Sequence, residues 1–242
     1  MTDTVTAARM PRMMLSRKEV TKVKKKTLVI INTNTLTLDM LNSLAAKILP
    51  DVELINIVDD SLLQEAKVYG VTPRVLSKMS MYVQCAEKSG ADIILNQCSS
   101  VGDAVEILRG MVNVPYIKID EPMAKKAVEI GTNIAVIGTV ASTLKPSCAL
   151  IEKTAAQMGK EVNVKPCLLD GVIELLATEE GKIKHDELLA EEVYRQAEEN
   201  DVVVLAQASM SRIVPKLKET RVPVLASPEI AFNEIKRMLD EM

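Results

Sequence analysis

Two stretches decide the fold of this chain, GADIILNQCSSVGD (90–103) and ENDVVVLAQASMSR (199–212). Each begins with an apolar run typical of a buried β-strand and continues into a short polar loop. The two align at an offset of 109 residues, which places Gln207 opposite Cys98 (98 to 207). The sequence therefore repeats one strand-and-loop unit but carries a thiol on only one copy.

The likeness extends to two further pairs of segments. VNVPYIKIDEPMAKKAVEI (112–130) resembles TRVPVLASPEIAFNEIKRM (220–238), and KTLVIINTNTLT (26–37) resembles NIAVIGTVASTL (133–144). All three pairs share nearly the same offset, which indicates two copies of one four-stranded unit rather than a chance likeness of βα segments.

Eight apolar runs alternate with helical patterns, which is typical of parallel strands buried on both faces. The expected strands are 27–32, 52–58, 92–97, 114–119, 133–138, 162–167, 201–206 and 222–227, and the expected helices include 72–89, 143–159, 186–200 and 228–242. We predict an α/β fold of two pseudo-symmetric domains with mainly parallel four-stranded sheets and an active-site cleft between them, at the carboxyl ends of the strands. The expected domains are 27–120 plus 228–242 and 121–227, preceded by a basic arm at 1–26.

Composition narrows the classes of function. The 242 residues are 48% hydrophobic and carry a net charge of −3, with Phe232 as the only Phe and no Trp. Mild charge and few aromatic side chains argue against a nucleic-acid partner. No apolar run approaches the ~20 residues that span a bilayer, and no secretion signal is evident, so we expect a cytoplasmic protein without membrane contact. The basic arm is interpreted either as a solvated tail or as a segment that docks on a neighbouring subunit.

The single histidine and the four cysteines set limits on catalysis. His185 lies in a charged run and is expected to be a solvated residue at a helix start, which makes a Ser-His-Asp triad improbable. The cysteines are far apart and no metal-binding spacing occurs, so no metal site is expected. Cys85, Cys148 and Cys167 are interpreted as packing residues. Cys98 differs because it follows a strand and precedes a helix, whose N-terminus stabilises a thiolate; the alternative is a small buried cysteine.

Small polar residues follow the strands of both halves. The candidates for substrate binding are Asn34 and Thr35 after the first strand, Asn96, Ser99 and Ser100 after the third, Thr139 and Thr143 after the fifth, and Ser209 after the seventh. Loops of this kind suit a carboxylate or phosphate because backbone N–H groups and hydroxyls converge at helix starts. Ordinary helix capping would favour the same residue types.

On the motifs INTNT, NQCSS, IGTVAST and LAQASM, the chain resembles the aspartate/glutamate racemase superfamily over nearly all of 27–242. That group includes amino-acid and hydantoin racemases, maleate isomerases and arylmalonate decarboxylases. The resemblance implies one cysteine from each domain on opposite faces of the substrate α-carbon, with no cofactor or metal. It assigns Cys98 as the first cysteine, Asn34 and Thr35 to a carboxylate-binding loop, and Thr139 and Thr143 to an anion-binding loop.

Gln207 departs from that pattern because it stands where the second cysteine is expected. A carboxamide cannot exchange a proton with carbon at neutral pH, although it can donate a hydrogen bond to a developing oxyanion. We therefore predict a cofactor-independent racemase- or isomerase-type enzyme that is not a standard two-cysteine racemase. In it, Cys98 is the acid/base or nucleophile, and Gln207 orients a small carboxylate substrate or stabilises its charge. The alternatives are a decarboxylase or a non-catalytic small-anion binding protein. Lys118, Asp120 or Glu121 could supply a second base, and a homo-oligomer is expected.

Overall fold

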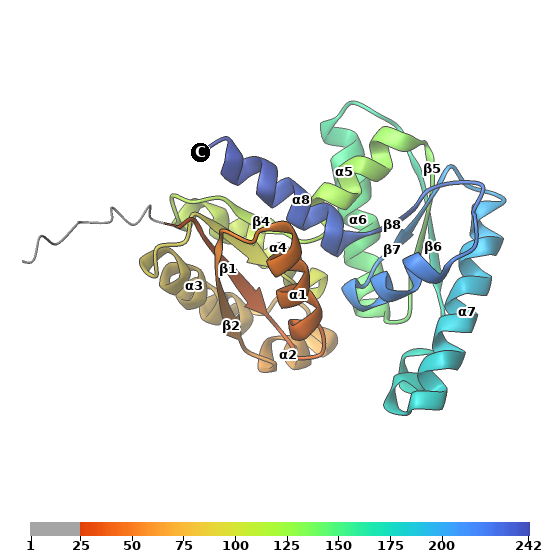
Figure 1. Ribbon diagram of the computed structural model, residues 1–242, viewed down its shortest axis with the longest axis horizontal. Helices are drawn as coiled ribbons and strands as arrows, with labels where there is room; N and C mark the ends of the chain where they lie inside the picture. Colours follow the sequence, from red (N-terminus) through yellow and green to blue (C-terminus); the bar gives the residue numbers. More distant parts are fainter. Residues whose placement is uncertain (1–24) are drawn as a thin grey trace, which may run out of the picture.

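The computed structural model describes residues 25–242 and contains two parallel four-stranded sheets (Figure 1). The predicted basic arm lies almost wholly outside the described residues. The first sheet has the strand order β2-β1-β3-β4 and the second has β6-β5-β7-β8. Their bounds are β1 Thr27–Asn32, β2 Glu53–Val58, β3 Ile93–Asn96, β4 Tyr116–Lys118, β5 Asn133–Gly138, β6 Asn163–Leu168, β7 Val202–Leu205 and β8 Val224–Ala226.

The two sheets repeat the same topology, which confirms the predicted α/β fold. The first strand of each half lies between the second and third, and every pairing is parallel. Even the register corresponds, since Asn32 pairs with Val58 at the end of β1 and Gly138 pairs with Leu168 at the end of β5. The strand ends, and the loops that follow them, therefore occupy matching places in the two halves.

The first sheet is covered on both faces by helices. Val29, Ile31 and Ile94 pack on one face against α2, α3 and α4, while Leu28 and Ile30 pack on the other against α1 and α8. These helices span α1 Leu38–Ile48, α2 Ser61–Tyr69, α3 Pro73–Lys88, α4 Gly102–Leu108 and α8 Ser227–Asp240, with short 3₁₀ segments η1 Ser99–Val101 and η2 Arg109–Met111. We call this sheet and its five α-helices the first lobe.

The second sheet is enclosed in the same way. Ile134 and Val136 face α5 and α6, whereas Ala135 and Ile137 face α7 and the 3₁₀ segment η4. The elements span α5 Glu121–Ile130, α6 Ala141–Gln157, η3 Ile173–Ala177, α7 Glu179–Ala197 and η4 Ala208–Lys216. We call this sheet and its helices the second lobe. Strands with continuous Val and Ile runs thus bury both faces, as parallel strands between helical layers require.

Two helices cross between the lobes. α5 follows β4 of the first sheet but packs in the core of the second, and α8 follows β8 of the second sheet but packs in the core of the first. The two helices also contact each other. In Figure 1, α8 (dark blue) runs from the second lobe to the first, where the chain ends. Each lobe therefore depends on a helix that the other half of the sequence supplies.

Two residue-level predictions are wrong. His185 is not solvated: it lies within α7 and is 2% exposed, and Arg212 of η4 lies 3.1 Å from its Nδ1. Cys85 is not a packing residue but an exposed one on α3, whose buried face carries Val83 and Ala86 instead. Within residues 25–242, no helix combines the length and the apolar character needed to cross a membrane.

Candidate active site between the two lobes

The loops at the carboxyl ends of the two sheets meet each other. Ser100, in η1 of the first lobe, donates a hydrogen bond from its hydroxyl to the carbonyl oxygen of Ser142 at 3.2 Å. That oxygen lies in the first turn of α6 and would normally accept from the N–H four residues later, but residue 146 is a proline and has none. Pro146 therefore leaves a helix carbonyl free, and the first lobe supplies its donor.

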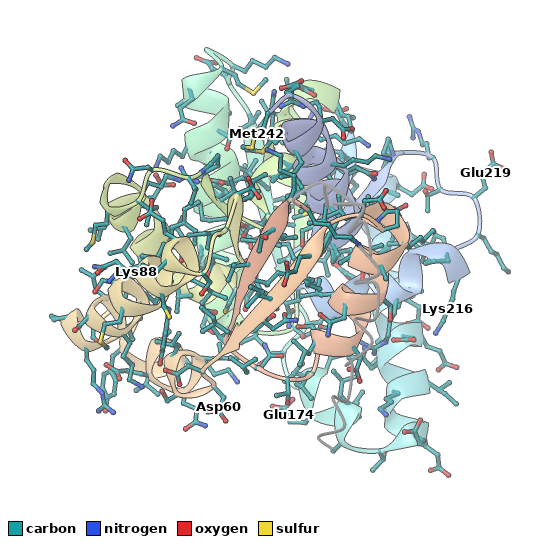
Figure 2. The ribbon with its side chains drawn as sticks, turned by 60° about the vertical axis from the view of Figure 1, so that its left-hand side comes forward. Asp60, Lys88, Glu174, Lys216, Glu219 and Met242 are labelled. Atoms are coloured by element: carbon teal, nitrogen blue, oxygen red, sulfur yellow. The ribbon has the colours of Figure 1, made fainter. Side chains whose placement is uncertain are left out.

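A corresponding contact joins the other pair of loops. The hydroxyl of Ser211, in η4 of the second lobe, lies 3.4 Å from the sulfur of Met40 in α1. Ala208, the first residue of η4, packs against the apolar cluster of the first lobe that contains Leu28 and Ile30. Loops from β1 and β3 thus touch loops from β7 and β5, so the strand ends of both sheets converge. Figure 2 shows Asp60 and Glu174, which follow β2 and β6, at the same end of the molecule.

Cys98 and Gln207 occupy equivalent backbone positions in the two lobes. Each residue directly precedes a 3₁₀ segment, with φ −118° and ψ 118° at Cys98 and φ −118° and ψ 132° at Gln207. Cys98 is 8% exposed and its side chain belongs to the apolar cluster of the first lobe. The Asn96 side chain donates to the Cys98 carbonyl oxygen at 2.8 Å, which fixes the loop after β3. Among residues 25–242, no hydrogen bond joins Cys98 to Gln207.

Gln207 is instead bound to the loop after β5. Its carboxamide oxygen accepts from the backbone N–H of Thr139 at 2.7 Å and from the Thr139 hydroxyl at 3.0 Å. The two donors that were predicted to bind a substrate anion are therefore occupied by a side chain of the same lobe. The NH₂ group is the part of Gln207 left to donate a hydrogen bond to a ligand.

The first lobe presents several buried oxygens that have no hydrogen-bond partner among residues 25–242. They lie at or just beyond the ends of β1, β3 and β4: Asn32 Oδ1, Thr33 Oγ1, Thr37 Oγ1, Asn96 Oδ1, Gln97 Oε1 and Asp120 Oδ1. Two further buried hydroxyls, those of Ser142 and Ser147, lie on α6. An unsatisfied buried polar atom costs roughly 1–3 kcal/mol, so a concentration of them at one sheet edge marks a place where water or a ligand completes the hydrogen bonding.

The other predicted binding residues have local partners. The Asn34 side-chain oxygen accepts from the N–H of Leu36, and the carbonyl oxygen of Thr35 accepts from the N–H of Leu38. Thr143 donates its N–H to Val140, which is ordinary helix-start bonding, and the Ser209 carbonyl oxygen accepts from Arg212 at 3.5 Å. The structure brings Asn96, Ser99 and Ser100 close to Cys98 and brings Thr139 to Gln207.

An ion-pair cluster beside η1 joins the lobes. The Lys118 ammonium lies 2.7 Å from Glu106, and Lys153 of α6 reaches the same carboxylate at 3.1 Å across the lobe boundary. Burial alone would raise the pKa of Glu106, but hydrogen bonds from both lysines lower it to about 2. Glu121 pairs with Arg109. Lys118 and Glu121 are therefore held in salt bridges, whereas Asp120 contacts Ser99 instead.

Ser142, Glu106 and Lys153 were not among the predicted site residues. Ser142 had a usable signal, because a proline four residues into an expected helix predicts a free carbonyl oxygen at Ser142. No sequence signal indicated Glu106 or Lys153, since their pairing depends on how α4 and α6 pack across the lobe boundary. Among the described residues, no group of three or more His, Cys, Asp and Glu side chains is placed to hold a metal ion.

Replacing Gln207 with alanine should release both Thr139 donors. We expect Gln207→Ala to bind inorganic phosphate about 10-fold more tightly than the wild type, since a hydrogen bond to a charged group contributes roughly 1.5–3 kcal/mol. Isothermal titration calorimetry measures the change. The double variant Gln207→Ala/Thr139→Val is the control and should lose the part of the gain that the Thr139 hydroxyl supplies, because the backbone N–H of residue 139 remains; unchanged affinity in the single variant would show that Thr139 does not face a ligand.

Comparisons with known proteins agree with this architecture. Allantoin racemase from Klebsiella pneumoniae superposes with a TM-score of 0.67 at 18% identity, covering 89% of this chain and 88% of the other. Glutamate racemase from Aquifex pyrophilus gives 0.60 at 19% identity, with coverages of 88% and 83%. A glycine-to-cysteine mutant of arylmalonate decarboxylase, in a sulfate-associated form, gives 0.59 at 14% identity, with coverages of 88% and 93%. At these identities the likeness shows the fold.

No curated protein matches the chain by sequence. The family model described as Asp/Glu/hydantoin racemase matches residues 28–235. That match spans both sheets and includes Cys98, Thr139 and Gln207. This chain therefore belongs to the Asp/Glu/hydantoin racemase family.

Proposed function

We propose that the chain is a cofactor-independent enzyme of the racemase/isomerase type that acts on a small carboxylate through Cys98. The observation that carries this proposal is the pair of equivalent loop positions, with a thiol in the first lobe and a carboxamide in the second. Family membership supports an enzyme of this type. The backbone equivalence supports the assignment of Gln207 to the place of a second cysteine.

The proposed chemistry is carbon-acid chemistry on one face of the substrate. The Cys98 thiolate removes a proton from the α-carbon or adds to an unsaturated carbon, both of which are established roles for a positioned thiolate. The Gln207 NH₂ group donates to the substrate carboxylate or to the enolate that develops from it. Because the Gln207 oxygen is fixed by Thr139, the NH₂ group is oriented before the substrate binds.

Deuterium exchange tests this function. The test uses a panel of amino acids, dicarboxylates, hydantoins and substituted malonates in D₂O. We expect the protein to replace the α-hydrogen of at least one of these compounds with deuterium, which proton NMR records as the loss of the α-hydrogen signal. Loss of CO₂ from a malonate would assign the decarboxylase alternative. Exchange without inversion, seen by chiral chromatography, would fit a single base on one face.

A second candidate function is a small-anion binding protein without catalysis. It is favoured by the low exposure of Cys98 and by the occupation of the Thr139 donors. In that case panel members would bind, as calorimetry would record, but no member would exchange its α-hydrogen or be converted.

A further inference from the structure

Asp120 is a buried carboxyl group that the proposed function leaves unused. It follows β4, which is the neighbour of β3, and is 3% exposed. Its Oδ2 accepts a hydrogen bond from the Ser99 hydroxyl at 2.6 Å. Its Oδ1 is buried with no partner among the described residues. Ser99 directly follows Cys98, so the carboxyl group is one hydroxyl away from the loop that carries the thiol.

The surroundings of Asp120 favour its neutral form. Burial raises the pKa of Asp120, and the Ser99 hydrogen bond and the charge of Lys118 oppose this only in part. Lys118 is itself 2.7 Å from Glu106, so its charge is shared with another carboxylate. Within the part of the chain that the structure describes, the charged groups around Asp120 are Lys118, Glu121, Asp103, Glu106 and Lys153. They include three acids and two bases, so no excess of positive charge holds Asp120 ionised.

A small cavity connects this pair to the boundary between the lobes. It has a volume of about 80 Å³, and Ser99, Lys118 and Asp120 of the first lobe line it together with Pro146 and Lys153 of the second. A polar space of this size is large enough for water, which needs only ~10–15 Å³ of probe-occupied volume. Water that occupies this space lies beside Ser99 and Asp120, which both line the cavity.

We propose that Asp120, acting through Ser99, holds a second exchangeable proton of the site, on the same side of the cleft as Cys98. This inference rests on the function proposed above. It makes Asp120 a positioning residue that reaches the reaction through the Ser99 side chain.

The Cys98 thiolate takes the proton from the substrate α-carbon, so an S–H bond forms and the C–H electron pair stays on the carbanion. When Asp120 is protonated, its acid proton takes over as the donor of the Ser99–Asp120 hydrogen bond and leaves the Ser99 hydroxyl proton free to face the substrate. Ser99 gives its hydroxyl proton to that carbon, forming a new C–H bond, while the Asp120 acid proton moves to Ser99 Oγ. Asp120 is left as a carboxylate and Cys98 as a thiol. The reverse sequence, or proton exchange with cavity water, restores the starting state.

Asp120→Asn tests the inference because it keeps the shape of the side chain but cannot release a proton. We expect it to slow α-hydrogen turnover by about 10²-fold, within the range of roughly 10²–10⁴ for general acid–base groups. Asp103→Asn is the matched control, since Asp103 lines the same cavity but is exposed; it should stay within about 3-fold of the wild type. Ser99→Ala should lose rate like Asp120→Asn.

The pH profile separates a proton-carrying role from a structural one. Asp120 must be protonated to act, so wild-type turnover should fall as the pH rises through its raised pKa. Asp120→Asn should lack that fall. An Asp120→Asn enzyme within about 3-fold of the wild type, with the same pH profile, would overturn the inference while leaving the role of Cys98 intact.

Infrared difference spectroscopy gives a readout that does not require turnover. At neutral pH we expect a carboxylic-acid C=O band in the wild type that is missing in Asp120→Asn and retained in Asp103→Asn. A wild-type spectrum without that band would show that Asp120 is ionised and would overturn the inference. If no panel member exchanges in the wild type, the proposed function fails, and the band still decides whether Asp120 holds a proton.

Discussion

Cys98→Ala is expected to reduce turnover of the substrate about 10³-fold or more, since removal of a general acid–base group costs roughly 10²–10⁴. A loss of that size equals about 4 kcal/mol of transition-state stabilisation at ~1.4 kcal/mol per factor of ten. The physical reason is that no other thiol can replace it: Gln207 holds the equivalent position in the second lobe. Steady-state rates on the substrate found by the exchange panel measure the effect.

Cys85→Ala is the matched control for this prediction. It removes another thiol from the first lobe, but Cys85 is exposed on α3 and does not lie in a loop at the carboxyl end of a strand. Its turnover should equal that of the wild type. Thermal unfolding of both variants separates a chemical loss from a folding defect, because Cys98 packs in an apolar cluster. A folded Cys98→Ala protein with near-wild-type turnover would remove Cys98 from the mechanism.

Phe232→Ala should destabilise the protein by about 3–5 kcal/mol, the usual cost of truncating a fully buried Phe. Phe232 is 0% exposed and lies on α8 in the cluster with Leu28, Ile30 and Leu41 of the first lobe. The truncation leaves a cavity between α8 and the first sheet. Urea unfolding followed by circular dichroism measures the loss from the shift of the transition midpoint.

Tyr69→Ala is the control for the stability prediction. Tyr69 is an aromatic residue of the same lobe but is 75% exposed at the end of α2. Its truncation should change the free energy of unfolding by less than about 0.5 kcal/mol, as for most surface substitutions. A Phe232→Ala loss below about 1 kcal/mol would mean that α8 does not complete the core of the first lobe.

Most of the fold could be predicted from the sequence because the strands are continuous apolar runs. The Val and Ile runs at β1 and β5 were predicted with the observed bounds, since buried parallel strands need no alternation of polar residues. α7 begins at Glu179, well before the predicted start at 186. The Thr178 hydroxyl accepts from the N–H of Gly181 at 3.0 Å and caps the helix there. Gly181 lies in the first turn and is a poor helix former, so the sequence pattern did not indicate that the helix starts there.

The site was less predictable because it depends on contacts across the lobe boundary. The motif after β3 identified Asn96, Cys98, Ser99 and Ser100 as one loop, and the structure keeps them together. The bond between Gln207 and Thr139 joins residues 68 positions apart, and no local pattern indicates it. The burial of His185 was also not predictable from a local pattern, because it involves a residue far along the chain. Arg212 of η4 lies 3.1 Å from the His185 Nδ1.

A single thiol in the first lobe is expected to perform carbon-acid chemistry between two duplicated lobes. The most direct test compares the wild type and Cys98→Ala in D₂O on the same panel of carboxylates and hydantoins, by proton NMR. We predict that the wild type exchanges the α-hydrogen of at least one compound and that the variant leaves the same signal unchanged. Equal exchange by both proteins, or binding by the wild type without exchange of any compound, would contradict the account.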